Sequence, residues 1–139
     1  ATFDTYCAAG VPHTQCIVTM ALAIAVALVA HHGTKIDRDL LIAASVLQDA
    51  SKLVEYEPGP DGKGRHTDIG RQYPHGFWCA MLAAQRGLPH ALSHITMTHS
   101  SSAAKFPDSI EGKILYYVDQ LDVIAVHKDR FKKHLMISK

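Results

Sequence analysis

Cysteine is scarce in this chain, and neither sign of charge dominates it. The three cysteines, Cys7, Cys16 and Cys79, are odd in number and form no C-x-x-C pair, which argues against a disulfide framework and favours free thiols in the cytoplasm. The formal net charge is only +1 with histidine neutral, so the composition gives no basis for a nucleic-acid partner. Neither a Walker-type loop nor a G-x-G-x-x-G sequence occurs, so a nucleotide-binding motif is lacking too.

Long apolar runs are missing as well. The most apolar stretch, residues 16–30, has fifteen residues, whereas a bilayer requires about 20. No basic segment precedes it and no small-residue cleavage site follows at the right distance, so it does not resemble a signal peptide. We therefore predict a soluble, cytoplasmic protein without a membrane partner, in which this stretch is a core helix surrounded on most sides. The same helix is also a possible interface for a homo-oligomer.

The residues that are abundant indicate one helical domain. Apolar residues make up 47% of the 139 residues and charged residues 19%, which is sufficient for a single buried core over residues 1–139. Helical periodicity and the placement of proline and glycine predict helices over residues 12–31, 37–55, 75–87, 89–99 and 108–124. The predicted fold class is therefore all-α, with about five or six helices.

Local signals place the ends of these helices. Pro12 suits the first turn of the first helix, and Asp37 is the expected N-cap of the second. Asp108 with Glu111 has the form of a capping box for the last helix. Residues 57–74 are rich in proline and glycine, so we expect a long loop there, without a helix or a central strand.

Two aspartates, Asp49 and Asp119, lie in segments that are otherwise apolar. Gln48, Asp49 and Lys52 share one flank of a helix, because residues three and four apart are neighbours on its surface. A carboxylate beside a buried surface requires a cation or hydrogen bonds to compensate its charge. The pair Asp49–Lys52 can be such a compensated pair at a pocket edge or part of a functional site, and the sequence favours neither. Asp122 is expected to face solvent or to pair with Lys128.

Histidine is the compositional excess, with ten residues. His13 opens the first predicted helix, His75 opens the third, and His99 closes the fourth. Together with the two aspartates, these histidines indicate a site for one or two divalent transition metal ions, with Mn, Fe, Zn, Co and Ni all suitable. Such an ion acidifies a bound water to hydroxide, which is a nucleophile at neutral pH.

The order of these residues resembles the HD-domain superfamily of metal-dependent phosphohydrolases. Gln48-Asp49-Ala50-Ser51-Lys52 is similar to the H-D-I-G-K sequence of that family, and residues 114–122 are similar to its I-L-x-x-A-D-x-L-D ending. His75-Gly76, Leu88-Pro89 and Thr98-His99 resemble its H-P-x-x-G, L-P and H-H segments. The resemblance extends from about residue 12 to 125. It implies an HD-like bundle in which one metal is held by His13, Gln48, Asp49 and Asp119, and a second is held with His75 and His99.

Gln48 stands where this family has the histidine of its His-Asp pair. A neutral amide oxygen is a weaker ligand for transition metals than an imidazole nitrogen, so Gln48 is expected to impair metal binding. Three explanations remain open: a catalytically silent HD-like binding module, an active enzyme with an amide ligand or an emptied ligand position, or a substitution introduced to silence activity.

The predicted function is a metal-dependent hydrolase acting on a small anionic substrate, with metal-bound hydroxide as the nucleophile and Asp49 and Lys52 as catalytic residues. The resemblance implies that the bond cleaved is a phosphoester. Lys52, Arg65 and Arg71 are the predicted substrate-binding residues, because cations recognise phosphate and carboxylate. Basic residues in a glycine-rich loop are also commonly just solvated. A binuclear iron oxygenase of the HD type is the alternative enzyme.

Overall fold

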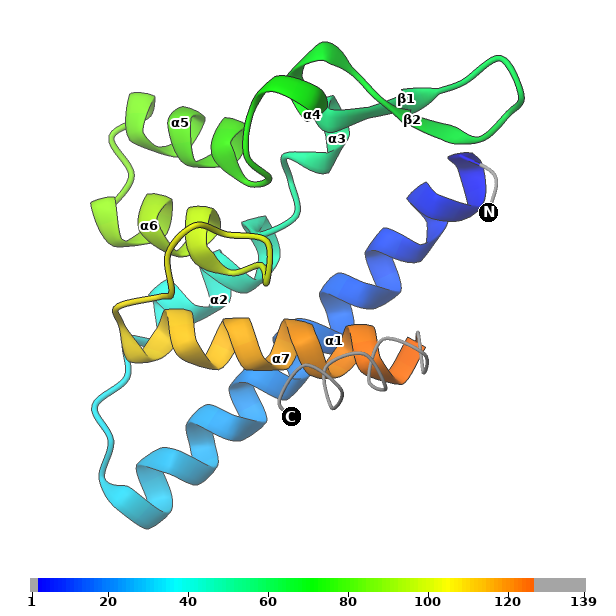
Figure 1. Cartoon of the computed structure of the whole chain (residues 1–139). Coiled ribbons are helices and arrows are strands. Elements are labelled where there is room, and N and C mark those ends of the chain that lie inside the picture. Colours follow the sequence, from blue (N-terminus) through cyan, green and yellow to red (C-terminus); the bar gives the residue numbers. More distant parts are fainter. Residues whose placement is uncertain (1–2, 127–139) are drawn as a thin grey trace, which may run out of the picture.

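The computed structural model describes residues 3–126, and this part of the chain is predominantly helical (Figure 1). Five of its helices have nine residues or more, which confirms the predicted all-α class. The elements in chain order are α1 (Phe3–His32), α2 (Arg38–Leu47), α3 (Lys52–Glu55), β1 (Tyr56–Pro58), β2 (Gly64–His66), α4 (Asp68–Gln72), α5 (Phe77–Gln85), α6 (His90–Thr98) and α7 (Ile110–Val126).

The core lies where α1, α2, α6 and α7 pack together, with α7 running across α1 in Figure 1. Ile17, Ala21 and Ala25 are four residues apart and therefore fall on one face of α1, where all three are buried. The partners of these residues come from the apolar faces of the other three helices. The remaining buried core residues are Leu41, Ala44, Leu92, Ile95, Ile114, Leu115 and Val118.

Helix α1 differs from its prediction in two respects. It begins at Phe3, so Pro12 lies inside the helix and not at its first turn. A proline inside a helix removes one backbone hydrogen bond and costs about 3 kcal/mol or more, yet α1 continues on both sides of Pro12. The expectation that this helix is surrounded on most sides is also wrong, because only 17% of the most apolar part of Gly10–His32 is buried. Among the described elements α2 and α7 make most of its contacts, and Val26 remains 67% exposed.

By length and composition alone, Gly10–His32 is a helix that could cross a membrane. Core helices of soluble proteins and signal sequences near an N-terminus share these properties. The absence of a membrane partner therefore stays a prediction, as does the cytoplasmic location.

The second predicted helix, residues 37–55, is interrupted. Its N-cap is confirmed, because the Asp37 side chain accepts a hydrogen bond from the Leu40 backbone N–H. After Leu47, however, the backbone changes from i→i−4 to i→i−3 hydrogen bonds, from Ala50 N–H to Leu47 O and from Lys52 N–H to Asp49 O. This tighter turn separates α2 from α3. The sequence pattern did not reveal the break, because tertiary hydrogen bonds such as the one from Cys79 N–H to Ser51 Oγ hold the turn.

The region predicted as a loop without helix or central strand is partly ordered. β1 and β2 form an antiparallel hairpin in which Glu57 faces Arg65, and the short helix α4 follows it. The Thr67 side chain caps α4 by accepting from Gly70 N–H, which is an ST-type cap that was overlooked in the sequence. The hairpin projects from the helical body in Figure 1.

The N-terminus of α7 is capped differently from the prediction. Ser109, not Asp108, accepts a hydrogen bond from the Gly112 backbone N–H through its Oγ. Glu111 does not complete a capping box, because its Oε1 accepts from Asp37 N–H at 2.7 Å and thereby connects α7 to the start of α2. Tertiary contact took precedence over the local motif at this position.

Candidate metal centre

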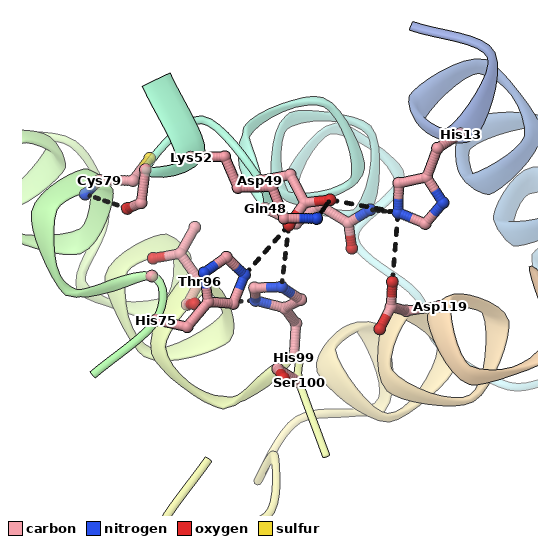
Figure 2. A network of polar contacts seen from close by, with 12 residues as sticks. His13, Gln48, Asp49, Lys52, His75, Cys79, Thr96, His99, Ser100 and Asp119 are labelled. Carbon is pink, nitrogen blue, oxygen red and sulfur yellow. Dashed lines mark hydrogen bonds and ion pairs between the residues drawn. The ribbon is translucent and has the colours of Figure 1, made fainter. Parts of the chain in front are cut away.

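Asp49 lies at the centre of a cluster of histidines (Figure 2). Its Oδ2 is 3.2 Å from Nε2 of His13, and its Oδ1 is 3.0 Å from Nε2 of His75 and 3.7 Å from Nε2 of His99. The three imidazole rings therefore direct the same nitrogen atom toward one carboxylate. The three histidines lie 26 to 50 positions from Asp49 in the sequence, and the fold brings them together around its carboxylate.

Five elements deliver the cluster. His13 projects from α1, Asp49 from the tight turn after α2, and Asp119 from α7. His75 precedes α5, and His99 directly follows α6. His75 and His99 lie at helix ends, as expected, whereas His13 does not open a helix but lies inside α1, which begins at Phe3.

Gly76 is required for the path of the chain beside His75. Its φ of 84° is in the left-handed region, which favours glycine. A Cβ atom added to Gly76 would lie 2.1 Å from the backbone oxygen of Thr96, which leaves no room for a side chain. The close approach of Gly76 to Thr96 places the turn that carries His75 next to α6, and His99 directly follows α6.

Asp49, His75 and His99 form a group that can hold a metal ion. Their ligand atoms all lie within 4.8 Å of one another, and His99 is buried. Ligands about 2.1 Å from a tetrahedral ion are about 3.4 Å apart, so the separations of 3.0 and 3.7 Å from Asp49 Oδ1 fit a shared cation. A direct hydrogen bond does not explain the His99 contact, because 3.7 Å is too long for one.

A second group surrounds His13 on the other side of Asp49. The Nε2 atom of His13 lies 3.3 Å from Asp119 Oδ1 and 3.4 Å from Gln48 Nε2, in addition to its contact with Asp49 Oδ2. Asp49 therefore contacts the two groups through different oxygens: Oδ2 faces His13, and Oδ1 faces His75 and His99.

Gln48 gives an independent sign that a ligand belongs in this second group. Its side chain is fully buried, yet its Oε1 atom has no hydrogen-bond partner, alone among the buried side-chain atoms of the described residues. An unpaired buried oxygen costs about 1–3 kcal/mol, so such atoms are rare without a reason. The Nε2 of Gln48 contacts His13, which is next to two carboxylates, so the amide oxygen of the same side chain is available to a divalent cation in this group. The residue types present therefore fit a metal at this position.

The electrostatics of the cluster favour anionic aspartate and cationic partners. Hydrogen bonds from His13 to Asp119 and Asp49 raise the pKa of His13 to about 10 against the effect of burial. Burial lowers the pKa of His75, but hydrogen bonds to Asp49 and Glu55 outweigh it and raise this pKa to about 9. Burial alone would raise the pKa of Asp49, yet the three histidines and Lys52 hold it well below its usual range. Asp49 is therefore ionised and available to a cation.

Three further groups contact the histidine rings at Nδ1, on the edge opposite Asp49. None of them was predicted from the sequence as part of the site. The Nδ1 atom lies 2.6 Å from Asp122 Oδ2 in His13, 2.7 Å from Glu55 Oε2 in His75, and 2.9 Å from the Thr96 carbonyl oxygen in His99. Asp122 is buried against His13, so the expectation that it faces solvent is wrong, and Lys128 lies outside the described residues. Its position three residues after Asp119 was an available signal, because both fall on one flank of α7. Glu55 had no motif around it.

The predicted substrate-binding residues occupy two different places. Lys52 lies beside the cluster, with its Nζ 2.7 Å from Asp49 Oδ2 and its side chain 36% exposed. Arg65 is paired with Glu57, and Arg71 is paired with Asp68, on the hairpin and α4.

Both arginines line an open pocket that includes no member of the histidine cluster. Its other lining residues are Val54, Glu57, Thr67, Asp68 and Ile69. The structure therefore does not bring Arg65 and Arg71 to the candidate metal centre, and their substrate role stays a prediction.

Comparison with known proteins gives one informative relative. Over 113 residues, which are 81% of this chain, the sequence is 27% identical to the dihydroneopterin 2',3'-cyclic phosphate phosphodiesterase of Methanocaldococcus jannaschii. The chain spans 45% of the length of that protein. No protein-family model matches the chain, and no solved structure matches it. The chain is thus similar to a phosphodiesterase and carries a group of residues that can bind a metal ion.

Proposed function

We propose that this protein is a metal-dependent hydrolase that cleaves a phosphoester bond in a small anionic molecule. The observation that supports this most directly is the convergence of three histidine Nε2 atoms on the ionised carboxylate of Asp49. The similarity to a phosphodiesterase supports phosphoester chemistry independently of that geometry. The resemblance of the residue order to the HD-domain superfamily agrees with both.

The candidate ligands would form two adjacent metal positions. Asp49, His75 and His99 would hold one divalent cation, and His13, Gln48 and Asp119 would complete a second position with the other oxygen of Asp49. A bound divalent cation supplies an acidified water as the nucleophile and polarises the phosphoryl oxygen.

Lys52 is suited to act on the substrate. Its ammonium group contacts Asp49 and its side chain is partly exposed. It can therefore reach a phosphate bound beside the metal centre. There it would stabilise the negative charge that develops on the phosphoryl oxygens. Arg65 and Arg71 would contribute only after exchanging their carboxylate partners Glu57 and Asp68 for the substrate.

The environment of Gln48 supports one of the sequence alternatives over another. Its buried, unpaired Oε1 supports an amide ligand in a working centre over a catalytically silent module, because a module without metal gains nothing from that unpaired atom. The similarity to a phosphodiesterase favours hydrolysis over an iron-dependent oxygenation.

The test is hydrolysis by protein prepared with each of Mn²⁺, Fe²⁺, Co²⁺, Ni²⁺ and Zn²⁺ in the absence of oxygen. The panel of substrates should include a phosphomonoester, a linear phosphodiester and a nucleoside 2',3'-cyclic phosphate. We expect phosphoester cleavage that Asp49→Ala abolishes and that Asp61→Asn, a change of an exposed hairpin carboxylate, leaves intact. Absence of cleavage with every metal would contradict the hydrolase, and oxygen consumption in a parallel aerobic assay would then favour the oxygenase.

A further inference from the structure

The three histidines of the candidate metal centre share one orientation. In each ring Nε2 faces Asp49 and Nδ1 faces an oxygen atom from another part of the chain. Two of these oxygens belong to carboxylates, Glu55 for His75 and Asp122 for His13, whereas His99 uses the backbone carbonyl of Thr96. An oxygen atom that accepts from Nδ1–H leaves the lone pair of a neutral imidazole on Nε2, which is the atom that faces the cluster.

We propose that Glu55 and Asp122 are positioning residues of the metal centre: each carboxylate accepts the Nδ1–H of one histidine and so presents the Nε2 of that ring to a metal ion. This inference rests on the proposed metal-dependent function. It assigns a role to Asp122, which is the last residue of the motif over residues 114–122, and it adds Glu55, which no motif of the centre contains.

Glu55 is built for this role at the end of α3. Its side chain is only 6% exposed, and its two oxygens accept from two different donors, Oε2 from His75 and Oε1 from the backbone N–H of Gly76 at 3.2 Å. Burying a carboxylate is costly unless several hydrogen bonds compensate it. Both of its donors lie in the turn that carries His75, so the carboxylate fixes the position of that turn as well as the rotation of the ring.

Asp122 has the equivalent place on the opposite side. It projects from α7 one turn after Asp119, its side chain is 9% exposed, and its Oδ2 lies 2.6 Å from His13 Nδ1. Asp119 and Asp122 thus contact the two nitrogens of one ring, Asp119 at Nε2 and Asp122 at Nδ1. One helix therefore supplies both a metal-facing carboxylate and the carboxylate that aligns the histidine next to it.

An anionic acceptor does more than a carbonyl oxygen can do. A carboxylate on Nδ1–H increases the electron density of the imidazole and raises the basicity of its other nitrogen toward a metal, besides fixing the tautomer. Removing such a partner typically weakens metal binding by about 10–100-fold. His13 and His75 are thereby the strengthened ligands, and His99, held by a neutral carbonyl, is the internal comparison.

The test compares Zn²⁺ dissociation constants, measured by competition with a chromophoric chelator, for the parent protein and variants of both residues. We expect Glu55→Ala and Asp122→Ala to raise the dissociation constant by about 10–100-fold, and Glu55→Gln and Asp122→Asn to lie between these and the parent. Asp61→Asn is the matched control, because it removes one exposed carboxylate outside the cluster and should change nothing. Circular dichroism at the titration temperature shows that each variant is folded.

A second readout does not require a metal. Hydrogen-bonded Nδ1–H protons of His13 and His75 should give two protected imidazole signals in proton NMR, one lost in Asp122→Ala and the other in Glu55→Ala. Folded alanine variants with unchanged Zn²⁺ affinity, or with both imidazole signals intact, would overturn the positioning role. If the parent protein binds no metal, the proposed function and the positioning role both fail, even where the NMR signals show the Nδ1–H hydrogen bonds. If metal binds as expected without phosphoester cleavage, the positioning role holds and only the reaction is wrong.

Discussion

Replacing Gln48 should separate the requirements of folding from those of the metal centre. In Gln48→Met a side chain of similar length loses both amide atoms, and with them the buried Oε1 that has no partner. An unsatisfied buried polar atom costs about 1–3 kcal/mol, so we expect the metal-free variant to be more stable than the parent by about 1–2 kcal/mol. For a domain of this size this corresponds to a rise in melting temperature of about 3–8 °C.

Metal binding should respond in the opposite direction. Gln48 belongs to the group around His13 and not to the group of Asp49, His75 and His99, so only one of the two metal positions should be affected. We expect Gln48→Met to weaken this position by at least about 10-fold, since even an indirect partner of a metal ligand has an effect of that size. Gln48→His should strengthen the same position, because an imidazole nitrogen replaces an amide oxygen.

The assay is a thermal melt of the chelator-treated proteins beside metal content by elemental analysis after dialysis against a fixed free Zn²⁺ or Mn²⁺ concentration. The parent, Gln48→Met and Gln48→His are purified side by side without a histidine tag. A less stable metal-free Gln48→Met with unchanged metal content would show that Gln48 is an ordinary core residue and not a metal ligand. Equal losses at both positions would refute the division of the centre into two groups.

Three other predictions follow from the same geometry. Asp49→Ala should abolish metal binding more completely than His99→Ala, because Asp49 serves both groups and His99 one; equal metal content in the parent and Asp49→Ala, measured as above, would rule out the assigned site. The pKa values of His13 and His75 are raised to about 10 and about 9, so their contribution to the stability of the metal-free protein is fully present below pH 6.5 and is lost as the pH rises through 9 to 10. Melts in chelator should therefore show a falling melting temperature over this range, whereas a flat profile would contradict the raised pKa values. Gly76→Ala should destabilise the protein by about 2–4 kcal/mol in urea unfolding, through its positive φ and its contact with the Thr96 carbonyl, and Gly62→Ala, with a positive φ but open space, should cost less.

Much of the helical framework was predictable from local physics. The Asp37 cap, the stop at Gly87 with its φ of 71°, and the apolar periodicity of α6 and α7 depend on residues close in sequence, and the structure has helices in these places. The errors occurred where distant groups compete with a local preference. Pro12 stays within α1, Glu111 bonds to Asp37 in place of a capping box, and the helix predicted over residues 37–55 breaks after Leu47.

The candidate site divides in the same way. The types and the order of the candidate ligands could be read from the amino-acid sequence. Successive helices can bring together nitrogen and oxygen ligands at the spacing of His13, Asp49, His75, His99 and Asp119. Only the tertiary structure decided which nitrogen of each ring faces Asp49, because the acceptors on Nδ1 come from other turns and helices. It also decided that Gln48 is buried with an unpaired oxygen, and that Arg65 and Arg71 pair with acidic neighbours away from the cluster. Ligand chemistry is a property of side chains, whereas ring orientation, burial and ion pairing depend on which surfaces pack together in three dimensions.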